Sequence, residues 1–132
     1  MTLAGATLRV ARSTGRMDEV TAFYVDGLAL ERLAAFEDHA GFDGVVLGAR
    51  NAPYHLEFTR RRGRPSRAAP DPETLLVFYL PDGAEWRAAV ERLRALGSKP
   101  VASHNPYWDS SGLTFEDPDG FRIVLQNAAW PL

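Results

Sequence analysis

The sequence predicts an α+β fold in which two tandem βαβββ modules form a cupped mixed sheet within a single domain, residues 1–132. The order strand, helix and three strands occurs twice along the chain. A segment of different composition separates the two occurrences. A glycine ends the predicted helix at the same place in each half. We expect module one at about residues 5–60, a linker at about 61–72 and module two at about 73–130.

The composition excludes several kinds of site and partner. The chain has no cysteine, which excludes disulfides, thiolate metal sites and cysteine nucleophiles. The net charge of -2 gives no sign of a nucleic-acid or membrane-surface partner. Residues 1–5 show no positively charged leader before an apolar run, and no apolar segment approaches the ~18 residues of a membrane span. We therefore expect a cytoplasmic protein that binds neither nucleic acid nor membrane.

Module one opens with a strand and a helix. Residues 6–12 alternate, with Leu8 and Val10 on one face, as in a half-buried strand. Residues 18–28 then place apolar side chains at helical spacing, and Gly27 marks the expected end of this helix.

Three strands follow the first helix. They are expected at residues 31–37, 43–48 and 54–59, joined by turns at 38–41 and 50–53. Along the last of these strands, Leu56 and Phe58 point to one face and His55 and Glu57 to the other.

Residues 60–72 contain five arginines, three prolines and one glycine without an apolar period, which predicts a linker. The arginines suggest phosphate binding, but five charges in a proline-rich connector are more often solvated. The pattern of module one then restarts. A strand is expected at 75–80, an amphipathic helix at 84–96, and three strands near 100–103, at 112–116 and at 121–127.

Two segments carry a resemblance to a known family: FYVDGLAL at residues 23–30 and EDPDGFRIVLQN at residues 116–127. They resemble the vicinal oxygen chelate superfamily, which includes glyoxalase I, fosfomycin- and bleomycin-resistance proteins, and extradiol dioxygenases. YHLEFT at residues 54–59 and NPYW at residues 105–108 are similar to a branch of small, uncharacterised bacterial members. The resemblance covers nearly the whole chain. It implies the cupped two-module fold, a small-molecule ligand in the cup and a homodimer.

The resemblance also implies where a metal would bind. Metal-dependent members take two ligands, usually histidine, from the first strands of the modules and two, usually glutamate, from the last strands. In this chain these places fall on Thr7, Glu57, Leu75 and Val124. Leucine and valine have no donor atom, and threonine rarely binds Zn, Fe or Mn. We therefore expect no cofactor, and a divalent metal held by His55 and Glu57 with ligands from loops is the alternative.

His55 and Glu57 are two residues apart on one strand, so both face the cup. Arg9, on the adjacent first strand, is the expected partner of the carboxylate, because a charge in a semi-enclosed pocket is costly without one. Two interpretations stay open. Arg9 and Glu57 form a structural pair in a polar cup, or all three residues recognise an anionic or polar ligand or move a proton through His55.

Aromatic residues of module two are further candidates for ligand binding. Tyr107 and Trp108, in a loop at the mouth of the cup, either form a stacking wall for a planar ligand or anchor the loop. Tyr79 points into the cup from the first strand of the module and contacts the ligand or fills the space. His39 is expected in a turn and His104 on the surface.

Three hypotheses for the function follow. The first is a glyoxalase/bleomycin-resistance-like protein that binds a small polar or aromatic compound without a metal. The second is a lyase, isomerase or dioxygenase-type enzyme that uses Glu57 and His55, metal-free or with a displaced metal. The third is an interaction role, with the cup filled by side chains such as Val77 and Tyr79.

Overall fold

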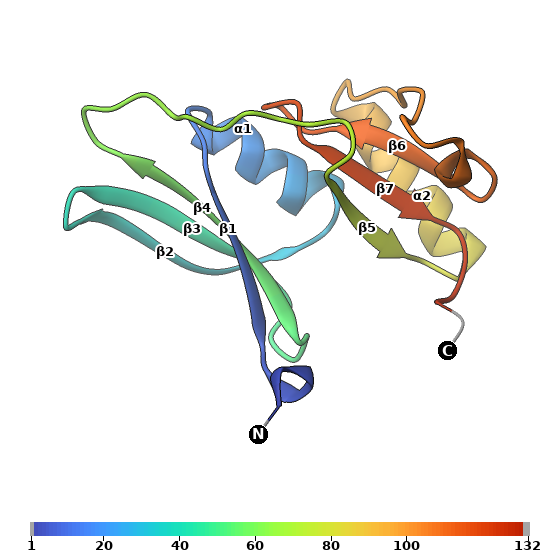
Figure 1. Ribbon diagram of the computed structural model, residues 1–132, viewed down its shortest axis with the longest axis horizontal. Helices are drawn as coiled ribbons and strands as arrows, with labels where there is room; N and C mark the ends of the chain where they lie inside the picture. The colour runs from blue at the N-terminus through green and yellow to red at the C-terminus, as the bar shows by residue number, and fades with distance from the viewer. Residues whose placement is uncertain (1, 131–132) are drawn as a thin grey trace.

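The computed structural model describes residues 2–130, whose strands form two sheets, each with an α-helix on one face (Figure 1). Module one contains the short helix η1 (Leu3–Gly5), β1 (Leu8–Ser13), α1 (Met17–Ala22), the π-helical turn η2 (Phe23–Gly27), β2 (Glu31–His39), β3 (Phe42–Gly48) and β4 (Tyr54–Arg61). Module two contains β5 (Leu75–Tyr79), α2 (Gly83–Ala95), the 3-10 helix η3 (Pro106–Asp109), β6 (Gly112–Glu116) and β7 (Arg122–Gln126).

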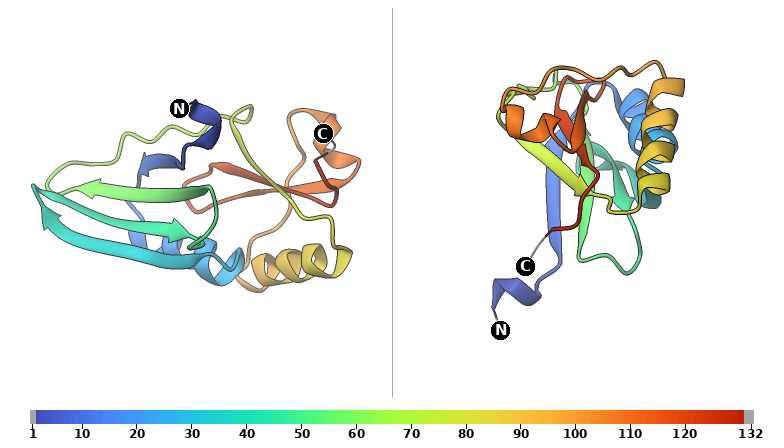
Figure 2. Two further views of the ribbon diagram at one scale, coloured as in Figure 1. Left: turned by 90° about the horizontal axis from the view of Figure 1, so that it is seen from below. Right: turned by 90° about the vertical axis from the view of Figure 1, so that its right-hand side faces the viewer.

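The predicted α+β fold of two successive modules is confirmed, and its strands divide between two hydrogen-bonded sheets. The strand orders are β1-β4-β3-β2 and β5-β7-β6. In both sheets the first strand of the module pairs in parallel with the last, and the other pairs are antiparallel. α1 packs on one face of the module-one sheet and α2 on one face of the module-two sheet, so the opposite face of each sheet is not covered by an α-helix (Figure 2). We call these the open faces.

The first helix differs from the expected continuous helix over residues 18–28. After six α-helical residues the chain widens into one π-helical turn, in which the Leu28 N–H reaches the Phe23 carbonyl at 3.1 Å. A Cβ atom on Gly27 would lie 2.6 Å from Leu93 Cδ2 of α2. Gly27 thus permits the close approach of the two modules' helices, while the left-handed conformation after the helix falls on Ala29, with φ of 59°.

The strand expected near residues 100–103 is another correction. Only Val101 forms a β-bridge, with Thr114, and its N–H reaches the Thr114 carbonyl at 2.8 Å. Pro100 has no N–H to extend this pairing. The chain then leaves the sheet edge and forms the loop that carries η3. The other elements occur within a few residues of their expected bounds.

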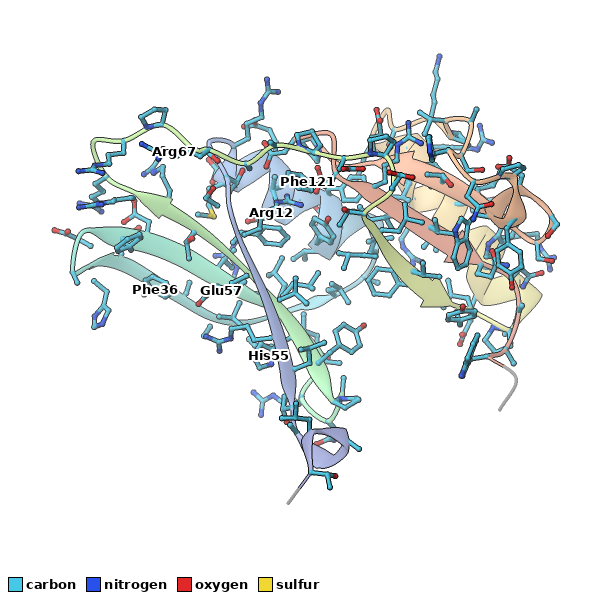
Figure 3. All side chains as sticks on the ribbon, in the orientation of Figure 1. Arg12, Phe36, His55, Glu57, Arg67 and Phe121 are labelled. Carbon is cyan, nitrogen blue, oxygen red and sulfur yellow. The ribbon has the colours of Figure 1, made fainter. Side chains whose placement is uncertain are left out.

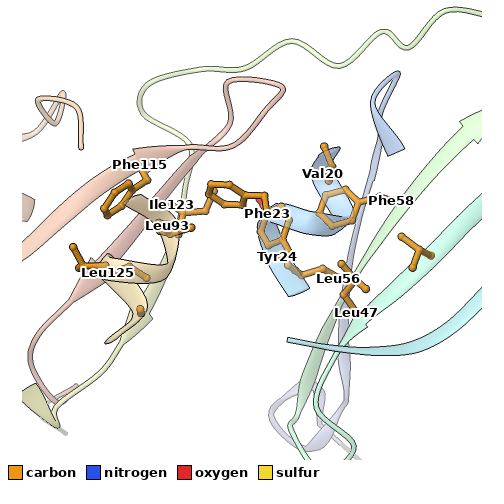
Figure 4. Packing of buried hydrophobic residues seen from close by; sticks show 13 residues of the cluster. Val20, Phe23, Tyr24, Leu47, Leu56, Phe58, Leu93, Phe115, Ile123 and Leu125 are labelled. Atoms are coloured by element: carbon orange, nitrogen blue, oxygen red, sulfur yellow. The ribbon is translucent and has the colours of Figure 1, made fainter. Parts of the chain in front are cut away.

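The core lies between the helices and the covered faces of the sheets (Figure 4). Its largest members come from both modules: Val20, Phe23, Tyr24, Leu47, Leu56, Phe58, Leu93, Phe115, Ile123 and Leu125. The alternation of β4 buries Leu56 and Phe58 in this core. His55 and Glu57 are therefore directed to the open face.

Arg12 of β1 connects module one to the turn between β6 and β7. Its Nη2 lies 2.8 Å from Asp117 Oδ2 and 3.4 Å from Asp119 Oδ2. Its guanidinium stacks over the ring of Phe121, 3.8 Å from the centroid, and lies 4.8 Å from the centroid of Phe58 (Figure 3). The Asp117 side chain is fully buried, so this ion pair shields a carboxylate that would be costly alone.

Two further interactions satisfy the Asp117 carboxylate. Oδ2 accepts a hydrogen bond of 2.8 Å from the Tyr24 hydroxyl. Oδ1 accepts from the backbone N–H groups of Asp119 and Phe121 at 2.9 and 3.0 Å. Burial, and secondarily the charge of Asp117, raises the pKa of Tyr24 well above its ordinary value. Tyr24 is thus a neutral donor to Asp117.

Within residues 2–130, no helix is both long enough and apolar enough to cross a membrane.

We predict that Asp117→Asn destabilises the protein by about 3–5 kcal/mol, because it leaves the Arg12 guanidinium without its buried counter-charge. The free energy of unfolding in urea measures the effect. The control is Glu116→Gln, which removes an exposed pair with Arg122 and is expected to cost at most about 1 kcal/mol. Equal stability of the two variants would contradict a central role for the Arg12–Asp117 pair.

Candidate functional site

Arg9, His55 and Glu57 meet on the open face of the module-one sheet. β1 and β4 run in parallel, with Arg9 opposite His55 in the register. Arg9 Nε donates to His55 Nε2 at 2.8 Å, and Arg9 Nη1 lies 3.2 Å from Glu57 Oε2. Figure 3 shows His55 and Glu57 on the strand beside β1. The contact between Arg9 and Glu57 expected from the sequence is present, while the role of these residues stays a prediction. We call them the Arg9 trio.

The hydrogen bonds of the Arg9 trio define its chemistry. His55 Nε2 accepts from Arg9, so the imidazole is neutral and carries its proton on Nδ1. The Arg9 guanidinium is half-exposed, and three of its five N–H groups remain for an additional acceptor. The trio can therefore orient an anionic or polar group.

A second candidate site lies on the open face of the module-two sheet, beneath the loop that carries η3. The loop encloses a cavity of about 180 Å³. Its lining residues are Pro72, Glu73, Leu75, Ser103, His104, Asn105, Trp108, Thr114 and Arg122. A designed cavity of about 150 Å³ in another protein accepts one benzene molecule. The loop cavity therefore has room for a single six-membered ring.

Two buried polar atoms near the loop cavity have no hydrogen-bond partner within residues 2–130. One is Oγ1 of Thr114, a cavity-lining residue that is 1% exposed. The other is Oε1 of Gln126, on the same face of the neighbouring strand β7. An unpaired buried polar group costs about 1–3 kcal/mol. The Thr114 hydroxyl is therefore available for a hydrogen bond with a group in the cavity.

The sequence analysis did not identify Thr114, Arg122 or Gln126. The signal was available in the alternation of the last two strands, where Phe115 and Ile123 face the core and these polar residues face the other way. Burial of Thr114 by the preceding loop, by contrast, is a tertiary feature. Arg122 holds this loop, because its Nη1 donates to a loop carbonyl, that of Ala102, at 3.1 Å.

The predicted aromatic residues lie in different surroundings. Trp108 lines the loop cavity. Tyr107 packs edge-on against it with ring centroids 4.9 Å apart, but is 61% exposed and is not among the lining residues. Tyr79 packs against Trp130 at 5.8 Å. All four residues belong to module two, whereas the Arg9 trio lies on the other sheet, so the sequence-predicted site residues fall into two groups (Figure 1).

His104 lies on the surface as expected, whereas His39, expected in a turn, is the last residue of strand β2. His39 is exposed at the end of β2, with its ring 6.3 Å from that of Phe36. His104 is half-exposed, and its Nε2 lies 3.3 Å from Glu73 Oε1.

The metal positions implied by the superfamily do not form a donor set for a divalent ion. Thr7 precedes β1 and Glu57 lies on β4, both in module one. Leu75 lies on β5 and Val124 on β7, two neighbouring strands of the module-two sheet. The Glu57 carboxylate is already paired with Arg9. No three histidine, aspartate or glutamate side chains within residues 2–130 converge on one point.

Comparison with known proteins identifies close relatives. Residues 8–59 match the YycE-like N-terminal domain, and residues 73–127 match the YycE-like C-terminal domain. The chain is 47% identical over 123 residues to the uncharacterized protein YycE of Bacillus subtilis (strain 168), an alignment that covers 93% of this chain and 88% of the relative. A crystal structure of a Bacillus subtilis YycE protein of unknown function matches with a TM-score of 0.88 and 45% identity, covering 96% of this chain and 93% of that chain.

More distant structures share the fold. Glyoxalase I of Leishmania major matches with a TM-score of 0.71 and 20% identity, covering 92% of this chain and 86% of that chain. TnmS3, an antibiotic binding protein from Streptomyces sp. CB03234, matches with a TM-score of 0.64 and 20% identity, covering 96% and 97% of the two chains.

Proposed function

The chain belongs to the YycE-like family, whose fold is that of the vicinal oxygen chelate superfamily, and from this premise we propose that it binds a small polar or aromatic compound without a metal. The observation that carries the proposal is the cavity beneath Trp108, whose lining includes the unpaired buried hydroxyl of Thr114. A planar ligand stacks on the indole and bonds to this hydroxyl. Arg122 keeps the loop in place through the carbonyl of Ala102.

Sequestration is the mode of action that we propose. The cavity is small and is lined by the loop, the end of the linker and the module-two sheet, which suits retention of a ring-sized group. The antibiotic-binding protein TnmS3, which has the same fold, offers a model for such a role. The apolar residues Leu75 and Val124 at two of the superfamily's metal positions favour binding over metal-dependent turnover.

We predict that phenol binds in the loop cavity. Thr114→Val should weaken its binding about tenfold, because the phenol hydroxyl loses its hydrogen-bond partner. The measurement is the shift of the Trp108 indole N–H resonance during titration. Thr114→Val also keeps or raises the free energy of unfolding of the ligand-free protein, since it removes an unpaired buried hydroxyl.

The control for this prediction is Thr74→Val, the same change at an exposed position beside the cavity. It should leave the affinity for phenol unchanged. Equal affinity of wild type and Thr114→Val would show that the hydroxyl does not recognise the ligand.

The second candidate function is catalysis by the Arg9 trio as a lyase, isomerase or dioxygenase-type enzyme. The observation in its favour is that Arg9 orients both His55 and Glu57 toward the open face. In this proposal Glu57 acts as the proton acceptor and His55, with its proton on Nδ1, as a donor.

If the protein turns over a compound found in a substrate screen, we predict that Glu57→Gln lowers kcat by about 100-fold or more, because the proton acceptor is lost. Glu37→Gln, a change at an exposed carboxylate of β2, is the control. Turnover that survives both Glu57→Gln and His55→Ala unchanged would exclude the catalytic role.

A homodimer is part of the proposal. The segment formed by η1 and the start of β1 projects away from the body of the chain (Figure 1). Within it Leu3, Leu8 and Val10 are 91%, 60% and 40% exposed. Apolar side chains on a projecting edge strand are typical of a surface that a second copy covers.

We predict that wild-type protein sediments as a dimer and that the double variant Leu8→Asp/Val10→Asp sediments as a single chain, because two charges would be buried in the interface. Ala84→Asp, at an exposed position in the first turn of α2, adds a similar charge elsewhere and should leave the dimer intact. A wild-type protein that sediments as a monomer at micromolar concentration would contradict the proposed dimer.

A further inference from the structure

The linker between the modules forms a groove with the end of the module-one sheet. It leaves β4, crosses the upper edge of the molecule and reaches β5 (Figure 1). A groove of about 290 Å³ lies between the linker and the open face of the module-one sheet. Its lining includes Ser13, Phe42, Thr59, Arg61, Arg64 and Arg67. We call it the arginine groove. It is separate from the loop cavity, which lies on the other sheet.

The five arginines at the end of β4 and in the linker divide into two sets. Arg60 and Arg62 lie 2.7 and 2.9 Å from the carboxylate oxygens of Asp43. The backbone N–H of Asp38 and the Arg60 guanidinium hold the pKa of Asp43 down to about 2, so this acid is charged and neutralises part of their charge.

The other set consists of Arg61, Arg64 and Arg67. Within residues 2–130, no carboxylate lies at ion-pair distance from any of the three. They place three positive charges at one groove in a chain whose net charge is -2. This local positive charge therefore favours the binding of an external anion.

The linker is fixed in this position. The hydroxyls of Ser13 and Ser66 are hydrogen-bonded at 2.8 Å, which joins the linker to β1. The Ser66 hydroxyl also accepts from the Ala68 N–H at 3.1 Å. A turn around Gly63, with φ of +79°, brings the Arg64 N–H to the Arg61 carbonyl at 3.2 Å. The arginines are thus held by backbone that is already ordered, which lowers the entropy cost of binding an anion.

The arginine groove also has an aromatic wall. Phe42 is 38% exposed, and the Arg61 guanidinium lies 5.9 Å from its ring centroid. An exposed ring beside three guanidinium groups suits a ligand with both a flat apolar body and an anionic group. A carboxylate is satisfied by one bidentate arginine, whereas the oxygens and double charge of a phosphate match three guanidinium groups.

We propose that the arginine groove binds a phosphate monoester on an aromatic body, with the phosphate between Arg61, Arg64 and Arg67 and the ring against Phe42. Glu57, two residues before Thr59 on the same face of β4, lies about 7 Å along the strand. Its carboxylate is paired with Arg9, so it does not neutralise the three arginines of the groove. The inference is independent of the loop cavity and of the Arg9 trio, because none of their residues lines this groove.

Titration of the full chain with phenyl phosphate at low ionic strength, followed by calorimetry and by backbone amide shifts, tests the proposal. We expect shifts at Phe42, Thr59 and the linker. Arg64→Gln/Arg67→Gln should weaken binding about tenfold or more, since two charge-assisted contacts are lost. Arg87→Gln/Arg94→Gln removes the same charge from exposed positions on α2 and should leave the affinity within about twofold.

Three further measurements separate the parts of the proposal. Phe42→Leu should weaken phenyl phosphate binding and leave inorganic phosphate binding unchanged, because it removes only the aromatic wall. Benzoate should bind more weakly than phenyl phosphate. Trp108→Ala should leave phenyl phosphate binding intact, whereas it disrupts the loop cavity, so failure here is distinct from failure of the proposed function.

Several results would overturn the proposal. They are equal losses in the two double variants, benzoate binding as tight as that of phenyl phosphate, and loss of binding in Trp108→Ala. Binding of a single-stranded oligonucleotide in the absence of phenyl phosphate binding would instead assign the groove to nucleic acid.

Discussion

The buried ion pair between Arg12 and Asp117 is the interaction on which the arrangement of the two modules depends. Asp117 is fully buried, and its carboxylate is satisfied from both sides: by Arg12 and Tyr24 of module one and by the backbone of its own turn. The aromatic ring of Phe121 completes the enclosure of the guanidinium. Charges taken out of water require close pairing of this kind. The pair therefore fixes where the end of module two lies against β1.

With the modules fixed in this way, the two open faces have different chemistry. The module-one face is charged, with the Arg9 trio in the middle and the arginine groove at the linker end. The module-two face is more enclosed, because the loop with Trp108 covers Thr114. A fold with two similar halves thus offers an ionic surface and a ring-sized cavity. This asymmetry supports binding of compounds that are partly polar and partly aromatic.

Much of the fold and of the Arg9 trio could be predicted from local sequence patterns. The alternation of β4 identified His55 and Glu57 as neighbours on the open face, and the parallel pairing of first and last strands brought Arg9 to them. Other features depended on contacts that the sequence does not display. Pro100 prevented a regular strand near residues 100–103, so this segment forms a single β-bridge and then continues as a loop. The helix ends at Gly27 as expected, but its last residues form a π-helical turn, and α2 packs closely against that glycine.

The sequence by itself determined the α+β fold, the order of its elements and the faces on which side chains lie, because these follow from period-two and helical spacing. It also determined that two of the superfamily's metal positions, Leu75 and Val124, have no donor atoms. Only the tertiary structure decided which polar groups are left without partners. Thr114 is buried because a loop closes over it, and Arg61, Arg64 and Arg67 line one groove because the linker is held to β1. Burial and convergence of this kind arise from contacts between distant segments, which no local pattern encodes.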